Sequence, residues 1–172
     1  MHDVVTSVFL VDSEPGYMHL LGNRLRTQVH VQLQEFTSGE DLFGYLEHDD
    51  LSTNEIYIAV VGFHLASVFD NALNGLEVAE TLQNAYPSVS VVMLAEEEEL
   101  ELTSAAVNRG AKAVVVRGEG VELQLASLVL RIQAKQRIAI RTQQLEMNAI
   151  FFTIFLVLFL CALYWCYRII VG

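Results

Sequence analysis

The sequence predicts an α/β fold, a doubly wound parallel sheet of five strands, followed by an apolar helix near the C-terminus. Short apolar runs rich in β-branched residues recur between residues 7 and 116, and helix-period stretches separate them. Continuous apolar runs such as AVV and VVML fit strands that are covered on both faces, as in a parallel sheet. Five successive strand–helix units therefore predict the doubly wound sandwich.

The apolar runs define the expected strands. These cover residues 7–12, 29–36, 56–62, 89–94 and 111–116. Stretches with helical spacing of apolar residues define the expected helices, which cover residues 15–27, 39–47, 75–85, 98–109 and the chain from about 121. Helix boundary signals agree, because Ser38 precedes the second helix, Asn74 opens the third and Gly110 follows the fourth.

Residues 149–167 form a nineteen-residue segment with no charged side chain. As a helix this segment would span about 28 Å, close to the roughly 30 Å of a bilayer's hydrocarbon core. Its eleven Leu, Ile, Phe and Val residues would contribute on the order of −3 to −7 kcal/mol to insertion. The alternative is a buried core helix, but such helices are usually shorter and carry a polar face. We therefore expect a transmembrane helix over residues 149–171.

Basic and aromatic residues at the ends of this segment predict its orientation. Four basic residues precede it between residues 131 and 141, whereas Arg168 alone follows it. The positive-inside bias then places the N-terminal domain in the cytoplasm and the C-terminus outside. The start of the chain lacks the basic region and cleavage site of a signal peptide. The expected membrane-interface residues are Arg137, Arg141, Tyr164, Trp165, Tyr167 and Arg168.

Acidic residues dominate the region before the apolar segment. Residues 1–122 hold twenty acidic and five Lys or Arg side chains, so a nucleic-acid partner is not expected, since phosphate neutralisation requires clustered basic residues. An ordinary solvated surface also explains this acidity.

Both cysteines, Cys161 and Cys166, lie inside the apolar segment, which leaves no zinc spacing or disulfide framework. We expect no metal and no cofactor.

Five segments in order resemble the response-regulator receiver domains of two-component signalling. They are VFLVDSEP, FTSGEDLFGYL, NGLEVAETL, VSVVMLAEEEE and NRGAKAVVVRGEG. The likeness covers residues 7 to about 133. It implies the receiver type of the flavodoxin-like fold and a bacterial protein, and the apolar tail then places it in the inner (cytoplasmic) membrane as a single-pass, tail-anchored chain.

The resemblance also implies a phosphoryl-transfer site at the carboxyl edge of the sheet. Receivers carry an acceptor aspartate after the third strand, a pair of acids that hold Mg²⁺ after the first, a Ser or Thr after the fourth and a Lys after the fifth. At these positions the chain has Gly62 in place of the acceptor aspartate, and Asp12 and Ser13 in place of the acidic pair. Ala95 stands in place of the Ser or Thr, and Arg117 in place of the lysine. Glycine cannot accept a phosphoryl group, and one carboxylate offers too few ligands for Mg²⁺. We therefore expect a degenerate receiver with no catalytic residue and no enzyme activity.

Several other residues near this site have alternative interpretations. Asp12 and Arg117 would form a bidentate ion pair that locks the site, or else remain two solvated charges. Asp70, in the loop 63–74, is a candidate displaced acceptor, but a long loop positions a nucleophile poorly. His64 is interpreted as a loop histidine, and the acids of residues 96–99 as complements to a helix dipole.

We expect three parts in the chain: a pseudo-receiver domain over 1–122, a helical connector over 123–148 that is basic near the membrane, and the transmembrane helix over 149–171. The connector contains no Pro or Gly, so the helix from 121 can continue into the bilayer. Its residues Leu125 and Ile132 belong to a 3,4-spaced apolar pattern that predicts a partner helix, although a strict heptad is interrupted.

Three functions are compatible with these observations. The leading one is a non-enzymatic, membrane-anchored pseudo-receiver that acts as a phosphorylation-independent interaction or scaffold subunit of a bacterial signalling, motility or secretion complex. Its partners would be the lipid bilayer and other proteins, with a homo-oligomer or a larger membrane complex expected. The second is a sensor of a small anion or nucleotide, which uses the space beside Asp12 and Arg117. The third is an active phosphorelay receiver with a displaced acceptor.

Overall fold

The computed structural model describes residues 5–48, 51–52, 55–65, 73–137 and 152–155. The chain divides into two units, Met1–Ala134 and Lys135–Gly172. The first unit holds a parallel sheet with the strand order β2-β1-β3-β4-β5. Its strands are β1 (Thr6–Val11), β2 (Gln32–Phe36), β3 (Ile56–Gly62), β4 (Val89–Ala95) and β5 (Ala113–Val116). The predicted doubly wound parallel sheet is therefore confirmed.

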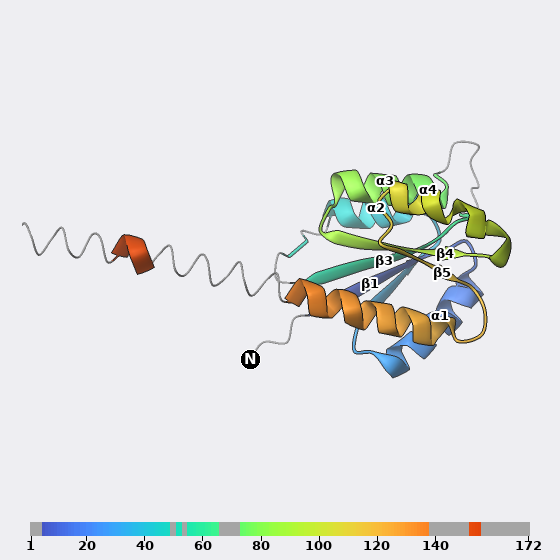
Figure 1. Ribbon diagram of the computed structural model, residues 1–172, viewed down its shortest axis with the longest axis horizontal. Coiled ribbons are helices and arrows are strands. Elements are labelled where there is room, and N and C mark those ends of the chain that lie inside the picture. Colours follow the sequence, from blue (N-terminus) through green and yellow to red (C-terminus); the bar gives the residue numbers. More distant parts are fainter. Residues whose placement is uncertain (1–4, 49–50, 53–54, 66–72, 138–151, 156–172) are drawn as a thin grey trace, which may run out of the picture. The chain divides into compact units, whose positions relative to one another are not determined.

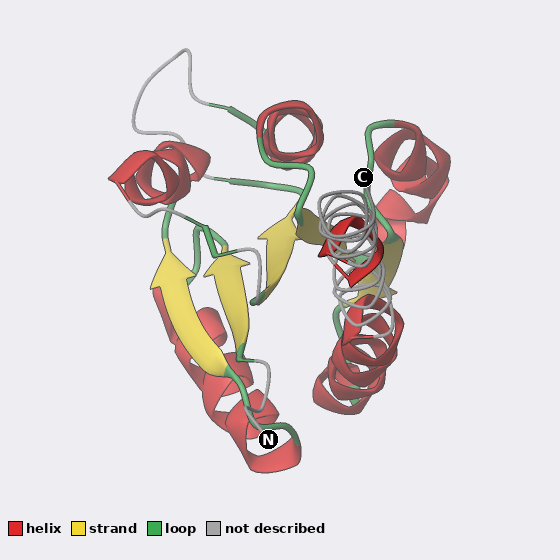
Figure 2. Cartoon of the chain, turned by 90° about the vertical axis from the view of Figure 1, so that its left-hand side faces the viewer, coloured by secondary structure: helices red, strands yellow, loops and turns green. Residues whose placement is uncertain are grey.

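Helices cover both faces of the sheet (Figure 1). They are α1 (Pro15–Gln28), α2 (Gly39–His48), α3 (Gly75–Ala85), the 3₁₀ helix η1 (Glu97–Leu102), α4 (Thr103–Asn108) and a helix over residues 121–137. Figure 1 shows α2, α3 and α4 on one face, with α1 and residues 121–134 of the last of these helices on the other. Figure 2, turned by 90°, shows the strands as a layer between these helices.

Alternation along the strands produces two hydrophobic cores. In β1, Phe9 and Val11 belong to the core beneath α2, α3 and α4, together with Leu42, Val78 and Ala106. The neighbouring side chains of β1, Val8 and Leu10, are also buried and point to the opposite face, since successive strand residues alternate. Leu21 of α1 and Leu125 and Val129 of the helix over 121–137 are buried as well. Strands β1, β3 and β4 are buried throughout, which explains their continuous apolar runs.

The predicted helix boundaries are confirmed where a side chain or a glycine defines them. Asn74 and Glu77 form a capping box, in which Asn74 Oδ1 accepts from the Glu77 N–H at 3.0 Å. Ser38 Oγ accepts from the Asp41 N–H at 3.1 Å, which caps α2. Gly110 follows α4 with a φ of +97°, the left-handed conformation that favours glycine.

The expected helix over 98–109 is wrong in its first half. Residues 97–102 form the 3₁₀ helix η1, and α-helical geometry begins only at Thr103. At the start of η1, Glu99 Oε2 accepts a hydrogen bond from the Glu96 N–H at 2.7 Å. The Glu99 carboxylate is buried and lies at the first turn of η1, a position that the interpretation of residues 96–99 as dipole complements allows.

The expected transmembrane span lies mostly outside the described residues. Among the described residues, no helix combines the length and the apolarity needed to cross a bilayer. Within the expected span the structure describes residues 152–155, which are helical. The side chains of Phe152 and Phe155 there are 69% and 68% exposed. Arg137 ends the described part of the helix from 121, whereas Arg141, Tyr164, Trp165, Tyr167 and Arg168 lie outside the described residues.

Candidate functional site

The ends of four parallel strands bring the predicted site residues together. Asp12 follows β1, Gly62 ends β3, Ala95 ends β4 and Arg117 follows β5. Because the strands are parallel, all four residues lie at the carboxyl edge of the sheet. The Arg117 N–H donates to the Ala95 carbonyl at 2.8 Å, which fixes the backbone of Arg117 beside β4.

The guanidinium of Arg117 contacts the carboxylate of Asp12 across the end of β3. Arg117 Nη2 donates to Asp12 Oδ2. Gly62 makes room for this contact, since a Cβ at that position would collide with Asp12 Oδ2 and would lie 3.1 Å from Arg117 Nη2. Glycine at the end of β3 is therefore a steric condition for the Asp12–Arg117 pair.

The other nitrogens of the guanidinium contact two further carboxylates. Arg117 Nε lies 3.2 Å from Glu96 Oε1, and Arg117 Nη1 lies 3.6 Å from Glu14 Oε1. The Tyr17 ring packs beneath the guanidinium, with Arg117 Cζ 4.6 Å from the ring centroid. The expected bidentate pair is thus replaced by a guanidinium shared among Asp12, Glu14 and Glu96. Arg117 links the loop after β1, the loop after β4 and the end of β5.

Asp12 is the most deeply buried acid of this cluster, with 1% of its surface exposed. Burial raises the pKa of the Asp12 carboxyl above its ordinary value, whereas a hydrogen bond from the Glu14 N–H and the charge of Arg117 oppose that rise. The Glu14 N–H donates to Asp12 Oδ1 at 3.0 Å. Burial also raises the pKa of the Tyr17 phenol. The side chain of Arg117 is only 13% exposed, so the pair is shielded from solvent.

His64 and Glu99 form a second pair beside Arg117. His64 Nε2 lies 2.6 Å from Glu99 Oε1, and the hydroxyl of the half-buried Ser13 donates to the His64 carbonyl at 3.3 Å. These contacts join the segment after β3 to the loop after β1 and to η1. A cavity of about 250 Å³ lies here, lined by Ser13, Glu14, Phe63, His64, Leu94, Glu96, Glu99 and Arg117.

Three carboxylates line this cavity against one guanidinium and one imidazole. The fourth carboxylate, on Asp12, lies behind Arg117 and contacts it. The cavity is therefore negatively charged even when His64 is protonated, a charge that repels phosphate and other anions.

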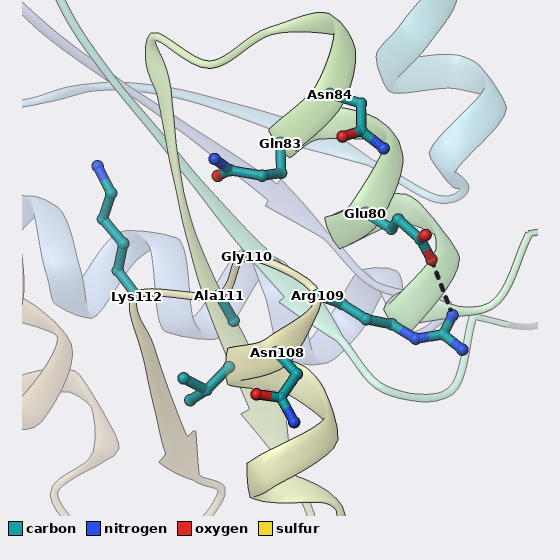
Figure 3. A pocket seen from close by; sticks show the side chains of 9 residues that line it. Glu80, Gln83, Asn84, Asn108, Arg109, Gly110, Ala111 and Lys112 are labelled. Carbon is teal, nitrogen blue, oxygen red and sulfur yellow. Dashed lines mark ion pairs between the residues drawn. The ribbon is translucent and has the colours of Figure 1, made fainter.

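A second cavity lies at the opposite, amino edge of the sheet, between α3 and the connection from α4 to β5 (Figure 3). Its volume is about 490 Å³, and the amides of Gln83, Asn84 and Asn108 line it. The carboxylate of Glu80 lies 3.1 Å from the Arg109 guanidinium at one end of this cavity. No sequence pattern indicated this cavity, because its residues come from two helix ends with no motif in common.

The structure places the residues predicted for this site at one edge of the sheet, together with neighbours that were not predicted. Asp12, Ser13, Gly62, Ala95 and Arg117 all lie at the carboxyl edge, as expected. Tyr17 and Glu14 were not singled out, although both follow Asp12 closely in the sequence. The sequence does contain a signal for the contact between Glu96 and Glu99, because their spacing of three residues permits the observed hydrogen bond. Asp70 lies outside the described residues.

Comparisons with known proteins identify the fold. No protein-family model and no curated protein matches this sequence. A response-regulator receiver domain from Clostridium thermocellum matches with a TM-score of 0.66 and 12% identity, over 78% of this chain and 99% of that one. A CheY-like receiver domain protein from Methanospirillum hungatei matches with a TM-score of 0.64 and 14% identity, over 78% of this chain and 98% of that one.

The receiver domain of NtrX from Brucella abortus gives a similar result. Its TM-score is 0.59 at 16% identity, over 72% of this chain and 98% of that one. Identities this low show the fold alone. The first unit of the chain has the receiver fold, which confirms the fold that the sequence resemblance implied.

The residues at the carboxyl edge do not fit the Mg²⁺ ion that the receiver fold implies. Ser13 offers a hydroxyl where the second metal-binding acid is expected, and Gly62 offers no side chain. The oxygen Oδ2 of Asp12 is already in contact with a guanidinium, whose positive charge opposes a second cation. Among the described residues, no group of three or more His, Cys, Asp or Glu side chains is arranged to hold a metal ion.

Proposed function

We propose that this chain is a non-enzymatic, membrane-anchored pseudo-receiver, which acts as an interaction or scaffold subunit of a bacterial signalling or envelope complex without being phosphorylated. The observation that carries this proposal is the contact between Arg117 and Asp12 in the space that Gly62 leaves open. In this arrangement an internal cation neutralises the buried carboxylate. Asp12 then has a cation partner without a metal ion.

Charge at the same edge argues against phosphoryl transfer. An incoming phosphodonor would approach the carboxylates of Glu14, Glu96 and Glu99, which line the cavity beside Arg117. Phosphoryl transfer depends on cations that neutralise charge developing on the phosphoryl oxygens, and the single guanidinium here already contacts three carboxylates. The geometry therefore supports a structural role for Arg117 rather than a catalytic one.

The surface of the first unit supports binding to other proteins. Strand β5 is an edge of the sheet and is only partly buried. Near it in the chain, Leu102 and Val107 expose 43% and 51% of their surfaces. Exposed apolar residues beside an edge strand are typical of an interaction surface. Receivers commonly pair through the region of the fourth and fifth helices, so this surface is our candidate for contact with partner proteins.

Membrane anchoring is the second component of the proposal. The uncharged segment 149–167 is long enough to span a bilayer, and the described residues within it expose Phe152, Ile154 and Phe155. Lipid is the environment in which three neighbouring exposed apolar side chains cost no free energy. The basic residues before the segment then place the receiver unit in the cytoplasm and the C-terminus outside the inner membrane.

A ligand sensor is the alternative, because a cavity lined by Arg117 is present at this edge. Asp12 does not line that cavity, and the carboxylates that do line it disfavour an anion or a nucleotide. Calorimetric titration of the full chain with inorganic phosphate and with ATP distinguishes the two functions. The scaffold proposal predicts no saturable heat with either compound, whereas binding abolished by Arg117→Met would favour the sensor.

Purification from membranes in mild detergent tests the scaffold function directly. We expect stable co-eluting proteins, and we expect the same set of proteins after a small-molecule phosphodonor and Mg²⁺ are added. A chain that elutes alone as a monodisperse monomer would contradict the proposal. Loss or gain of partners on phosphodonor treatment would instead favour the third function, a phosphorelay receiver with a displaced acceptor.

A further inference from the structure

The cavity beside Arg117 contains a buried carboxylate oxygen that accepts no hydrogen bond. Glu99 exposes only 7% of its surface and lines this cavity of about 250 Å³. Its Oε2 accepts from the Glu96 N–H, whereas its Oε1 has no hydrogen-bond donor among the described residues. A buried carboxylate oxygen without a donor costs free energy. A donor that enters the cavity would therefore be stabilised by Glu99 Oε1.

His64 does not supply this donor in the structure. Its Nε2 lies 2.6 Å from Glu99 Oε1, but the contact lacks the geometry of a hydrogen bond. The imidazole offsets the charge of the carboxylate only when it is protonated, and the His64 side chain is 85% exposed. Glu99 Oε1 can therefore accept from a second donor inside the cavity.

The charges around the cavity favour a cation as that donor. The carboxylates of Glu14 and Glu96 line the cavity together with the carboxylate of Glu99. The single positive charge of Arg117 is offset by Asp12, which contacts it. Among the described residues, no group of three or more His, Cys, Asp or Glu side chains is arranged to hold a metal ion. An organic cation therefore fits this cavity better than a metal ion does.

Two apolar side chains define which organic cation fits. Phe63 and Leu94 are buried and line the same cavity as the carboxylates. Their apolar surface would cover methylene groups, which hydrated inorganic cations do not have. A primary ammonium group carries three N–H donors and one positive charge on a methylene stem. The lining of the cavity is therefore complementary to an alkylammonium group.

We propose that this cavity binds a primary alkylammonium group, with its nitrogen on Glu99 Oε1 and its methylene stem against Phe63 and Leu94. A lysine side chain of a partner protein and a free small amine both carry this group. The site does not rest on the proposed function, since all the residues that line the cavity belong to the first unit.

Backbone amide NMR spectra of the full chain in mild detergent test this site. The probe is butylammonium chloride. Sodium butyrate, which has a similar stem and the opposite charge, and sodium chloride are the controls. We expect saturable shifts of the amides of Phe63, Leu94 and Glu99 with butylammonium alone. Shifts that do not saturate, or that sodium chloride reproduces, would overturn the site.

Three variants show whether the ammonium group binds at Glu99. Glu99→Gln keeps an acceptor for the Glu96 N–H but removes the charge, so we expect butylammonium to bind about tenfold more weakly. Glu96→Gln removes a more exposed carboxylate of the same cavity, should also weaken binding, and serves as the test if Glu99→Gln does not fold. Glu101→Gln is the matched control, because Glu101 is exposed on η1 outside the lining of the cavity. Unchanged binding in Glu99→Gln, or equal weakening in all three variants, would contradict the proposal.

Two further probes distinguish the sources of the alkylammonium group. Nα-acetyl-lysine amide represents a lysine side chain of a partner protein, and diaminobutane represents a free small amine. Tighter binding of the lysine derivative supports a partner protein as the source, whereas tighter binding of diaminobutane supports a free amine. Absence of saturable shifts with both compounds would overturn the site, whether or not other proteins co-elute with the chain.

Discussion

Arg117 and Asp12, 105 positions apart in the sequence, form an ion pair that crosses the end of strand β3. Asp12 follows a central strand and Arg117 follows an edge strand, with β3 and β4 between them. Gly62 ends β3 and leaves the space in which the guanidinium and the carboxylate meet. The absence of a side chain at Gly62 therefore permits the contact that neutralises the buried Asp12 carboxylate.

Removal of Arg117 should destabilise the domain more than removal of Asp12. In Arg117→Met the buried Asp12 carboxylate loses its cation, and we expect a loss of about 2–4 kcal/mol in the free energy of unfolding at pH 7. In Asp12→Asn the guanidinium keeps Glu96 and Glu14, so a smaller loss is expected. Urea denaturation of the purified variants measures both. Arg24→Met, which removes an exposed ion pair with Glu122, is the control and should cost under about 1 kcal/mol.

The destabilisation by Arg117→Met should depend on pH. Because burial raises the pKa of Asp12 in the folded state, the stability linked to this group is fully present below its unfolded-state pKa of about 3.9 and is lost as pH rises through the folded-state pKa. Without Arg117 that folded-state pKa rises further, so the variant should lose more stability between acidic and neutral pH than the wild type. A difference between the two proteins that stays constant from pH 4 to pH 8 would show that Asp12 is not the responsible group.

Gly62→Ala should also destabilise the protein, because its Cβ would collide with the Asp12 carboxylate. We expect a cost of about 1–3 kcal/mol, as for other insertions into packed sites. Gly44→Ala in α2 is the matched control, since a Cβ there meets nothing within 4 Å. That substitution should raise stability by about 0.5–1 kcal/mol. Thermal unfolding of both variants measures these changes in stability. An equal change in melting temperature for the two variants would contradict the steric role of Gly62.

Charges placed inside the apolar segment should release the chain from membranes. Val157→Arg together with Leu160→Arg would add about 5–7 kcal/mol to the cost of insertion, comparable to the whole favourable term. We expect wild-type protein to remain in the membrane pellet after alkaline carbonate extraction and the double variant to appear in the supernatant. Arg168→Lys keeps the charge at the far end and should behave as wild type. Retention of the double variant in the pellet would argue against a span at these residues.

Local patterns predicted most of the fold. Strands β1, β3 and β4 are buried on both faces, so their apolar runs were unambiguous. Strand β2 is largely exposed and begins at Gln32, later than expected. Its alternating polar residues did not indicate where the strand starts. The 3₁₀ helix η1 was not predicted, because the spacing of residues in a short segment does not separate a 3₁₀ turn from an α-helical one.

The sequence predicted which residues lie at the candidate site but not how their side chains contact one another. The resemblance to receivers indicated which residues reach the carboxyl edge, and all five lie there. It did not indicate that Arg117 would divide its nitrogens among Asp12, Glu14 and Glu96, because that depends on side-chain directions across three loops. The Tyr17 ring under the guanidinium was missed for the same reason.

Intact mass spectrometry after incubation with acetyl phosphate and Mg²⁺ tests the central proposal most directly. A receiver domain that retains its acceptor aspartate serves as the positive control under identical conditions. We predict that the mass of this chain stays unchanged while the control gains a phosphoryl group. A phosphoryl adduct on this chain, mapped by peptide analysis to Asp12, Asp70 or any other carboxylate, would contradict the account.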